Sequence, residues 1–214
     1  LGDVYKRQVN IAMVNELKLI FERMDINIWE VIEAANSKPF GFMPFYPGPG
    51  MGGHCIPIDP FYLSWKAKEF NTEAKFIELA GEVNRKMTEN VAHRIGKALN
   101  DHSKSIRKSN ILMLGLAYKK DIDDMRESPA LKIAELLRFK GANISYHDPN
   151  INDAKELKFV ELNKESLRKA DAVVITTDHS NVDYEMVGKY ARLIIDTRNV
   201  MAGVKNPKAD VLRA

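Results

Sequence analysis

Apolar residues in the first half of the chain recur at helical spacing. Between residues 9 and 24 they fall at three- and four-residue steps, which predicts an amphipathic helix from Val9 to Met24. A second, short helix is predicted from Ile28 to Ala35, where Asn27 can cap the first turn.

The longest apolar stripe predicts the longest helix of the chain. Its positions lie three or four residues apart: Phe76, Leu79, Val83, Met87, Val91, Ile95 and Leu99. A stripe sustained over this length usually packs against other helices. Periodicity leaves two partners open, namely a second copy of the chain across a dimer interface or other segments of the same chain.

The pattern changes after a polar, aperiodic segment from Asp101 to Ser109, which predicts a helical domain over residues 1–102 and a second domain over residues 103–214. In the second part, short apolar runs predict strands at residues 110–115, 142–147, 172–176 and 193–196. Ser128 as cap and Pro129 as first residue predict a helix through Lys140, ended by Gly141. Strands that alternate with helices indicate an α/β domain with a mostly parallel sheet.

Ligands of such sheets bind beyond the carboxyl ends of the strands. In this chain those positions are residues 115–120, Asp148, residues 176–177 and residues 196–199. The first of these loops carries Gly115 alone and not Gly-x-Gly-x-x-Gly, so the dinucleotide-binding fingerprint is missing there. Lys119, Lys120 and Arg126 are candidates for contacts to phosphate groups, and a solvated charge cluster explains them equally well.

A glycine-rich loop from Gly48 to Pro60 contains the single cysteine, Cys55. Its glycines, among them Gly52 and Gly53, allow the backbone to approach a ligand closely. A lone cysteine is often a small buried apolar residue, and in an open glycine-rich turn it is also a candidate nucleophile. Asp59 is most simply the N-cap of a helix over residues 61–70 with Pro60 as its first residue, and its carboxylate could also orient water or a base.

Composition narrows the class of protein. The 214 residues are 45% hydrophobic and 29% charged, which is typical of a globular chain with a substantial core. No apolar run reaches the length of a membrane span, and one cysteine fits a reducing compartment, so we expect a cytoplasmic protein. A net charge of +3 argues against nucleic acid as a partner, and the five dispersed histidines predict no metal site.

Several blocks together resemble the UDP-glucose/GDP-mannose dehydrogenase family, in the family's order and spacing. They are residues 9–16 (VNIAMVNE), the glycine–cysteine loop through Asp59, residues 115–119 (GLAYK), residues 123–129 (DDMRESP) and residues 196–199 (DTRN). Each block alone is a weak signal, and the set covers nearly the whole chain from residue 9.

The resemblance implies a helical dimerisation domain followed by a Rossmann-like domain that binds the sugar nucleotide, with an NAD-binding domain before both. It implies oxidation of carbon six of a nucleotide-bound sugar to a carboxylate, with two NAD used in succession. Cys55 would be the nucleophile that forms a thiohemiacetal and then a thioester, and Asp59 would help to position water and base. The implied substrate contacts are Gly52, Gly53, Tyr118, Lys119 and Arg198, and Arg126 would contact the NAD phosphates.

Two departures from the family pattern affect these expectations. No NAD domain occurs in these 214 residues, so we expect the chain alone to be inactive. The family's catalytic asparagine aligns with Val4 and its lysine falls before Leu1, so residues 1–8 resemble a foreign junction more than native helix.

The sequence around the cysteine is most similar to the branch that oxidises UDP-N-acetylhexosamines for surface polysaccharide precursors. UDP-N-acetylglucosamine is the first expectation for the substrate and UDP-N-acetylmannosamine the second. Two other classes stay open: a non-catalytic module that binds nucleotide sugars and dimerises, and a cysteine hydrolase. The hydrolase is the weakest, because no histidine has a motif context that would make it a base.

Overall fold

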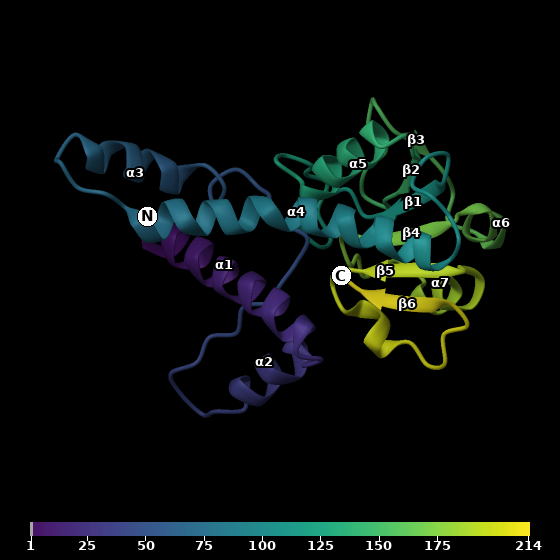
Figure 1. Ribbon diagram of the computed structural model, residues 1–214, viewed down its shortest axis with the longest axis horizontal. Helices are drawn as coiled ribbons and strands as arrows, with labels where there is room; N and C mark the ends of the chain where they lie inside the picture. The colour runs from purple at the N-terminus through teal and green to yellow at the C-terminus, as the bar shows by residue number, and fades with distance from the viewer. Residues whose placement is uncertain (1) are drawn as a thin grey trace.

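The structure is a computed structural model that describes residues 2–214, and it has a helical half and an α/β half (Figure 1). The helical half contains α1 (Gly2–Arg23), α2 (Ile28–Asn36), α3 (Asp59–Lys68) and α4 (Lys75–Asp101). The helices of the α/β half are α5 (Pro129–Phe139), α6 (Lys164–Lys169), α7 (Tyr184–Tyr190) and the 3₁₀ helix η1 (Val200–Gly203). Its strands are β1 (Asn110–Leu114), β2 (Asn143–His147), β3 (Lys158–Phe159), β4 (Ala172–Ile175), β5 (Leu193–Asp196) and β6 (Asp210–Arg213).

Helix α1 begins at Gly2, earlier than the predicted start at Val9, and continues without a break through Gln8. The segment lacks the apolar period that predicts a helix, and an Asp3–Arg7 ion pair one turn apart at 2.8 Å supports it locally. The expectation of a foreign junction at residues 1–8 falls partly on Leu1, which lies outside the described residues.

Two helix starts test the sequence predictions. The cap of α2 is confirmed, because the Asn27 side chain accepts a hydrogen bond from the backbone N–H of Trp29 at 3.2 Å. The predicted cap of α3 is wrong by one residue: Ile58 occupies the N-cap position without a side-chain bond, and Asp59 is the first helical residue. The backbone N–H of Asp59 already donates to the carbonyl of Cys55 at 2.8 Å, which places Asp59 inside the first turn.

Within residues 2–214 the strands form one six-stranded sheet in the order β3-β2-β1-β4-β5-β6, with parallel neighbours throughout. This is a doubly wound order: β2 and β3 are added on one side of β1, and the chain then returns to the centre of the sheet and adds β4, β5 and β6 on the other side. The four predicted strands are confirmed as β1, β2, β4 and β5, whereas β3 and β6 were not predicted.

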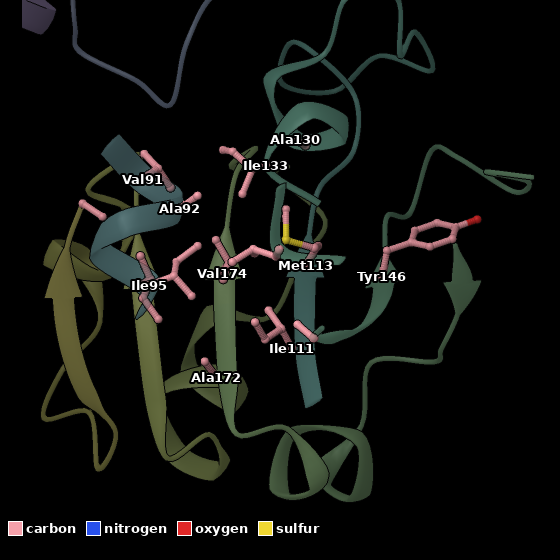
Figure 2. Close-up of a cluster of buried hydrophobic side chains, with 14 of the residues drawn as sticks. Val91, Ala92, Ile95, Ile111, Met113, Ala130, Ile133, Tyr146, Ala172 and Val174 are labelled. Carbon is pink, nitrogen blue, oxygen red and sulfur yellow. The ribbon is translucent and has the colours of Figure 1, made fainter. Parts of the chain in front are cut away.

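Both faces of the sheet are covered. Side chains alternate along each strand, so Ile111 and Met113 of β1 join one core cluster while Leu112 and Leu114 join the other. The first cluster lies under α4 and α5, and Figure 2 shows Val91, Ala92 and Ile95 of α4 directed at the sheet. Helices α6 and α7 cover the opposite face.

Helix α4 connects the two halves of the molecule (Figure 1). Its apolar stripe divides accordingly: Met87, Val91, Ile95 and Leu99 are fully buried within the chain, whereas Phe76 and Leu79 are 79% and 56% exposed. Packing within the chain therefore accounts for the second part of the stripe and leaves the first part uncovered. Among residues 2–214, no helix combines the length and the apolar character needed to cross a lipid bilayer.

Candidate functional site

The glycine–cysteine loop lies against the α/β half, and its glycines make this contact sterically possible. An added Cβ at Gly52 would lie 2.6 Å from Cβ of Tyr118 and 2.9 Å from the carbonyl oxygen of Glu127. At Gly53, where φ is +96°, it would lie 2.9 Å from the Tyr118 ring. The N–H of Gly53 also donates to the carbonyl of Arg126 at 3.0 Å. The loop therefore packs against the predicted site residues of the second half.

Replacing Gly52 by alanine is expected to lower the free energy of unfolding by about 1–3 kcal/mol, because the new methyl group overlaps backbone and Cβ atoms that cannot rotate away. Urea denaturation of the 214-residue chain measures this. Gly203→Ala is the matched control, since its Cβ would meet no described atom within 4 Å and should change stability by less than about 1 kcal/mol. Equal effects of the two substitutions would contradict the docking of the loop.

Two buried asparagines and one arginine hold the start of the loop. The Asn15 side chain accepts a hydrogen bond from the N–H of Gly48 at 3.0 Å and donates to Asn84 at 2.9 Å. From the other side, the Arg198 guanidinium lies so close to Gly48 that a Cβ there would be 2.8 Å from Nη1. Nε of Arg198 donates to the carbonyl of Thr176 at 2.9 Å. Arg198 thus joins the loop to the carboxyl ends of β4 and β5.

Sequence reasoning missed Asn15 and Asn84 as parts of this site. Both are polar residues within strongly periodic helices, where local sequence gives no sign that an asparagine is buried. They are 0% and 3% exposed. The one available signal was the position of Asn15 inside the family-like block of residues 9–16.

Cys55 is exposed at the end of the loop, in a turn that leads directly into α3. The Nδ1 atom of His54 lies 3.9 Å from the Cys55 Sγ atom. Arg126 is the nearby cation: its pKa is raised chiefly by hydrogen bonds to Asp124, and the charges of Tyr118 and Cys55 add to the effect. The thiol therefore faces solvent and is not packed in the core.

Arg126 and Asp124 form a two-pronged ion pair. Nε and Nη2 of Arg126 donate to Asp124 at 2.9 and 2.6 Å, and the backbone N–H of Arg126 donates to the same carboxylate at 2.9 Å. These bonds lower the pKa of Asp124, with a smaller contribution from the charge of His54. Among the described residues no hydrogen bond joins Asp124 to His54, so the Cys–His–acid relay of a hydrolase is not assembled.

The remaining predicted residues lie around this group with few contacts of their own. Asp59 is half-buried at the start of α3, one turn from Cys55, and its carboxylate makes no hydrogen bond within the described residues. Lys119 is exposed, and Lys120 lies 3.9 Å from Asp178. The backbone N–H of Tyr118 donates to the carbonyl of Asp124 at 3.0 Å, which fixes the segment that carries Tyr118 and Lys119.

The crevice between β1 and β4, where doubly wound sheets bind dinucleotides, is occupied by the protein itself. The carboxylate of Asp148 accepts hydrogen bonds from the N–H groups of Leu116 and Ala117 at 2.6 and 3.0 Å. These are the amides that would otherwise face a pyrophosphate. A Cβ at Gly115 would lie 2.5 Å from the Cβ of Thr177, so the first loop also packs tightly against the segment that follows β4.

This crevice does not fit NAD. Of the residues described, Arg126 is the one predicted for NAD, and its side chain is 64% exposed with Nη1 outside the bonds to Asp124. It fits a contact to a phosphate approaching from solvent and supplies no cofactor pocket. Residues 2–214 likewise contain no cluster of three or more His, Cys, Asp or Glu side chains arranged to hold a metal ion.

Comparison with known families gives two matches along the chain. Residues 4–86 match the central domain of the UDP-glucose/GDP-mannose dehydrogenase family, and residues 112–203 match that family's UDP binding domain. The first match contains the glycine–cysteine loop, and the second contains Tyr118, Arg126 and Arg198.

Individual relatives agree with these matches. The chain is 38% identical over 204 residues to a UDP-N-acetyl-D-mannosamine dehydrogenase of Pyrococcus horikoshii, covering 91% of this chain and 46% of the relative. It is 36% identical to an NDP-N-acetyl-D-galactosaminuronic acid dehydrogenase of Ralstonia nicotianae, over 91% and 45% of the two chains. A solved structure of the UDP-D-ManNAc dehydrogenase from P. horikoshii superposes with a TM-score of 0.84 at 33% identity, covering 98% of this chain and 49% of that one. The chain thus spans about half the length of the relatives it matches.

Proposed function

Because the chain belongs to the UDP-glucose/GDP-mannose dehydrogenase family, we propose that it is the sugar-nucleotide-binding part of an NAD-dependent enzyme that oxidises carbon six of a UDP-N-acetylhexosamine to a carboxylate. The product would be a uronic acid precursor of surface polysaccharides. The observation that supports this most directly is the docking of the Cys55 loop on Tyr118, Arg126 and Arg198.

Each residue of the site has a chemical role in the proposal. The Cys55 thiol would add to the aldehyde of the half-oxidised sugar to give a thiohemiacetal, which would become a thioester by losing the hydride on carbon six and the hydroxyl proton. Water would then displace the sulfur, leaving the carboxylate and the free thiol. Asp59, one turn away, orients that water. The glycines at 52 and 53 expose backbone to the sugar, while Tyr118, Lys119 and Arg198 contact the nucleotide. NAD, when bound, accepts the hydrides, and Arg126 would meet its phosphates.

The relatives change the order of the expected substrates. Several of the similar proteins are named UDP-N-acetyl-D-mannosamine dehydrogenases, from P. horikoshii, Methanococcus vannielii and Campylobacter jejuni. We therefore place UDP-N-acetylmannosamine ahead of UDP-N-acetylglucosamine, which the local sequence had favoured.

The decisive experiment expresses the complete open reading frame and follows NADH formation at 340 nm with UDP-N-acetylmannosamine, UDP-N-acetylglucosamine and UDP-glucose. Two NADH per sugar oxidised are expected with an N-acetylhexosamine substrate. No NADH with any of the three would overturn the proposed activity. The 214-residue chain, assayed in parallel, should form none.

A non-catalytic nucleotide-sugar-binding module is the second candidate, because the described residues contain the UDP binding domain without a cofactor pocket. Calorimetry on the 214-residue chain shows which side chains contribute to the binding of UDP-sugars. UDP-sugar binding should survive Cys55→Ala and should weaken about tenfold or more in Arg198→Ala, which removes a guanidinium at the loop. Arg192→Ala, at an exposed position on the same domain, is the control. If the complete enzyme binds UDP-sugars and yields no NADH, the module is the better description.

The proposal includes a homodimer formed through the central helices. Large apolar side chains remain exposed along α1, directly after it and in the first turns of α4, namely Met13, Ile20, Met24, Phe76 and Leu79. A second copy would cover them, since exposed apolar patches of this kind mark interfaces. Sedimentation equilibrium of the complete protein tests this, and a monomer at micromolar concentration would contradict it.

A further inference from the structure

A cleft separates the second half of α1 and the start of α2 from strands β5 and β6, and no residue of the Cys55 loop lines it. Its volume is about 660 Å³, enough for a small metabolite. Its charged lining consists of Lys18, Glu22, Asp25, Arg94, Asp196 and Arg213. The lining residues belong to both halves of the molecule, since they come from α1, α2 and α4 and from the segments around β5 and β6. Figure 1 shows where these elements lie.

Lys18 is the unusual member of this lining. The residue is only 6% exposed, and its Nζ atom has no hydrogen-bond partner among the described residues. Burial, together with repulsion from Arg94, lowers the pKa of Lys18 to about 8, and the charge of Asp196 opposes this in part. An unpaired buried ammonium is costly, so a site that keeps one requires an explanation.

Two of the acidic side chains that line the cleft, Glu22 and Asp196, have partners other than Lys18. Glu22 forms an ion pair with Arg94, whose Nη2 also donates to the carbonyl of Arg213 at 2.7 Å. The two carboxylate oxygens of Asp196 accept the N–H groups of Arg198 and Met201 at 2.9 and 2.8 Å.

Burial raises the pKa of Asp196, and backbone hydrogen bonds, among them those from Met201 and Arg198, oppose this in part. Asp25 is exposed at the end of α1. The exposed Arg213 side chain has no ion pair within residues 2–214, so it adds a second available cation on the wall opposite Lys18.

We propose that this cleft is a second anion site, which holds a phosphate-type oxyanion between Lys18 of the helical half and Arg213 of the α/β half. The four-carbon stem of lysine lets the ammonium turn into the cleft without backbone movement, and arginine presents paired donors that match phosphate oxygens. An anion bound there links the two halves of the molecule and stabilises their docking. The lining of this cleft does not include Cys55, Tyr118, Arg126 or Arg198, so the proposed site uses other side chains than the one around Cys55, although Asp196 adjoins both.

The test uses sulfate and inorganic phosphate as probes of the 214-residue chain, with binding followed by calorimetry and by the shift of the thermal midpoint. Both anions should bind, and Lys18→Met should weaken them about tenfold or more. Lys6→Met, at an exposed position on the same helix, is the matched control and should leave binding unchanged. UDP binding should be the same in wild type and Lys18→Met.

Two further readouts separate a binding role from a structural one. Without added anion, Lys18→Met should raise the thermal midpoint, because it removes an unpaired buried charge; a lysine needed for the fold would lower it. Sulfate stays dianionic at these pH values, so its affinity should be constant up to pH 8 and fall by up to about tenfold per pH unit above it, as Lys18 loses its proton.

Three outcomes overturn the proposal. The first is anion binding that survives Lys18→Met, and the second is an absence of measurable binding of either probe to wild type. The third is loss of anion binding in Arg198→Ala together with retention in Lys18→Met, which would assign the anion to the nucleotide site.

Discussion

Replacing Asp148 by alanine is expected to lower the free energy of unfolding by about 3–5 kcal/mol. Its carboxylate is 1% exposed and accepts the N–H groups of Leu116, Ala117 and Asn150 at 2.6, 3.0 and 2.8 Å. Nε2 of His179 is a fourth partner at 3.1 Å. Alanine would leave these donors buried without an acceptor, and each such group costs more than a hydrogen bond usually contributes.

The geometry also fixes which atom of His179 carries the proton. The backbone N–H of Asp121 donates to Nδ1 at 3.0 Å, so Nδ1 is unprotonated and the proton lies on Nε2, which donates it to Asp148. The four donors outweigh the effect of burial and lower the pKa of Asp148 to about 2.

An acid-induced loss of stability follows from this lowered pKa. Because the folded value lies below the unfolded value of 3.8, the stabilisation is complete above pH 4 and is lost as the pH falls from 4 toward 2. The loss amounts to about 2 kcal/mol. Urea denaturation at pH 2 to 6 measures it, and Asp148→Asn should lack this component. Asp153→Ala, an exposed carboxylate on the next loop, should change stability by less than about 0.5 kcal/mol. A stability loss in Asp148→Ala no larger than in that control would contradict the network.

The sequence predicted the sheet well and the crevice beside Asp148 poorly. Strands β1, β4 and β5 are continuous apolar runs, because both faces of a parallel sheet are buried, and such runs are visible in sequence. Strand β3 is two exposed residues and β6 alternates weakly, so neither stands out from loop sequence. The missing glycine fingerprint was apparent, but its replacement by an aspartate from the end of β2 depends on strand order.

The sequence pointed to individual residues of the candidate site, but it did not show that they lie next to one another. Motif resemblance singled out Tyr118, Arg126 and Arg198, but periodicity and spacing cannot say that they contact a loop far away in the chain. That contact depends on α4, whose buried half fixes the two halves relative to each other. The exact start of α3 was missed because Asp before Pro is a strong cap signal, and the turn from Cys55 overrides it.

Replacing Cys55 by alanine in the complete enzyme is expected to reduce turnover by on the order of 10⁴-fold while leaving UDP-sugar affinity within about threefold. Under the proposed mechanism no thioester forms without the sulfur, so the second oxidation loses its covalent route. Because the Cys55 side chain is exposed and is not packed in the core, its replacement should not impair folding, so a loss of turnover would reflect the missing thiol. Steady-state NADH formation and calorimetry with the sugar nucleotide measure the two effects separately.

His54 provides the control that tests the role of the thiol in this prediction. Its Nδ1 atom lies 3.9 Å from Sγ, beyond the range in which a base takes a proton directly, and no acid orients the ring. His54→Ala should therefore reduce turnover by less than about tenfold, whereas a Cys–His pair of the hydrolase type would make the two substitutions comparably severe. A Cys55→Ala enzyme that retained a tenth of its activity would contradict covalent catalysis. Loss of activity in both variants would instead support a histidine-activated thiol.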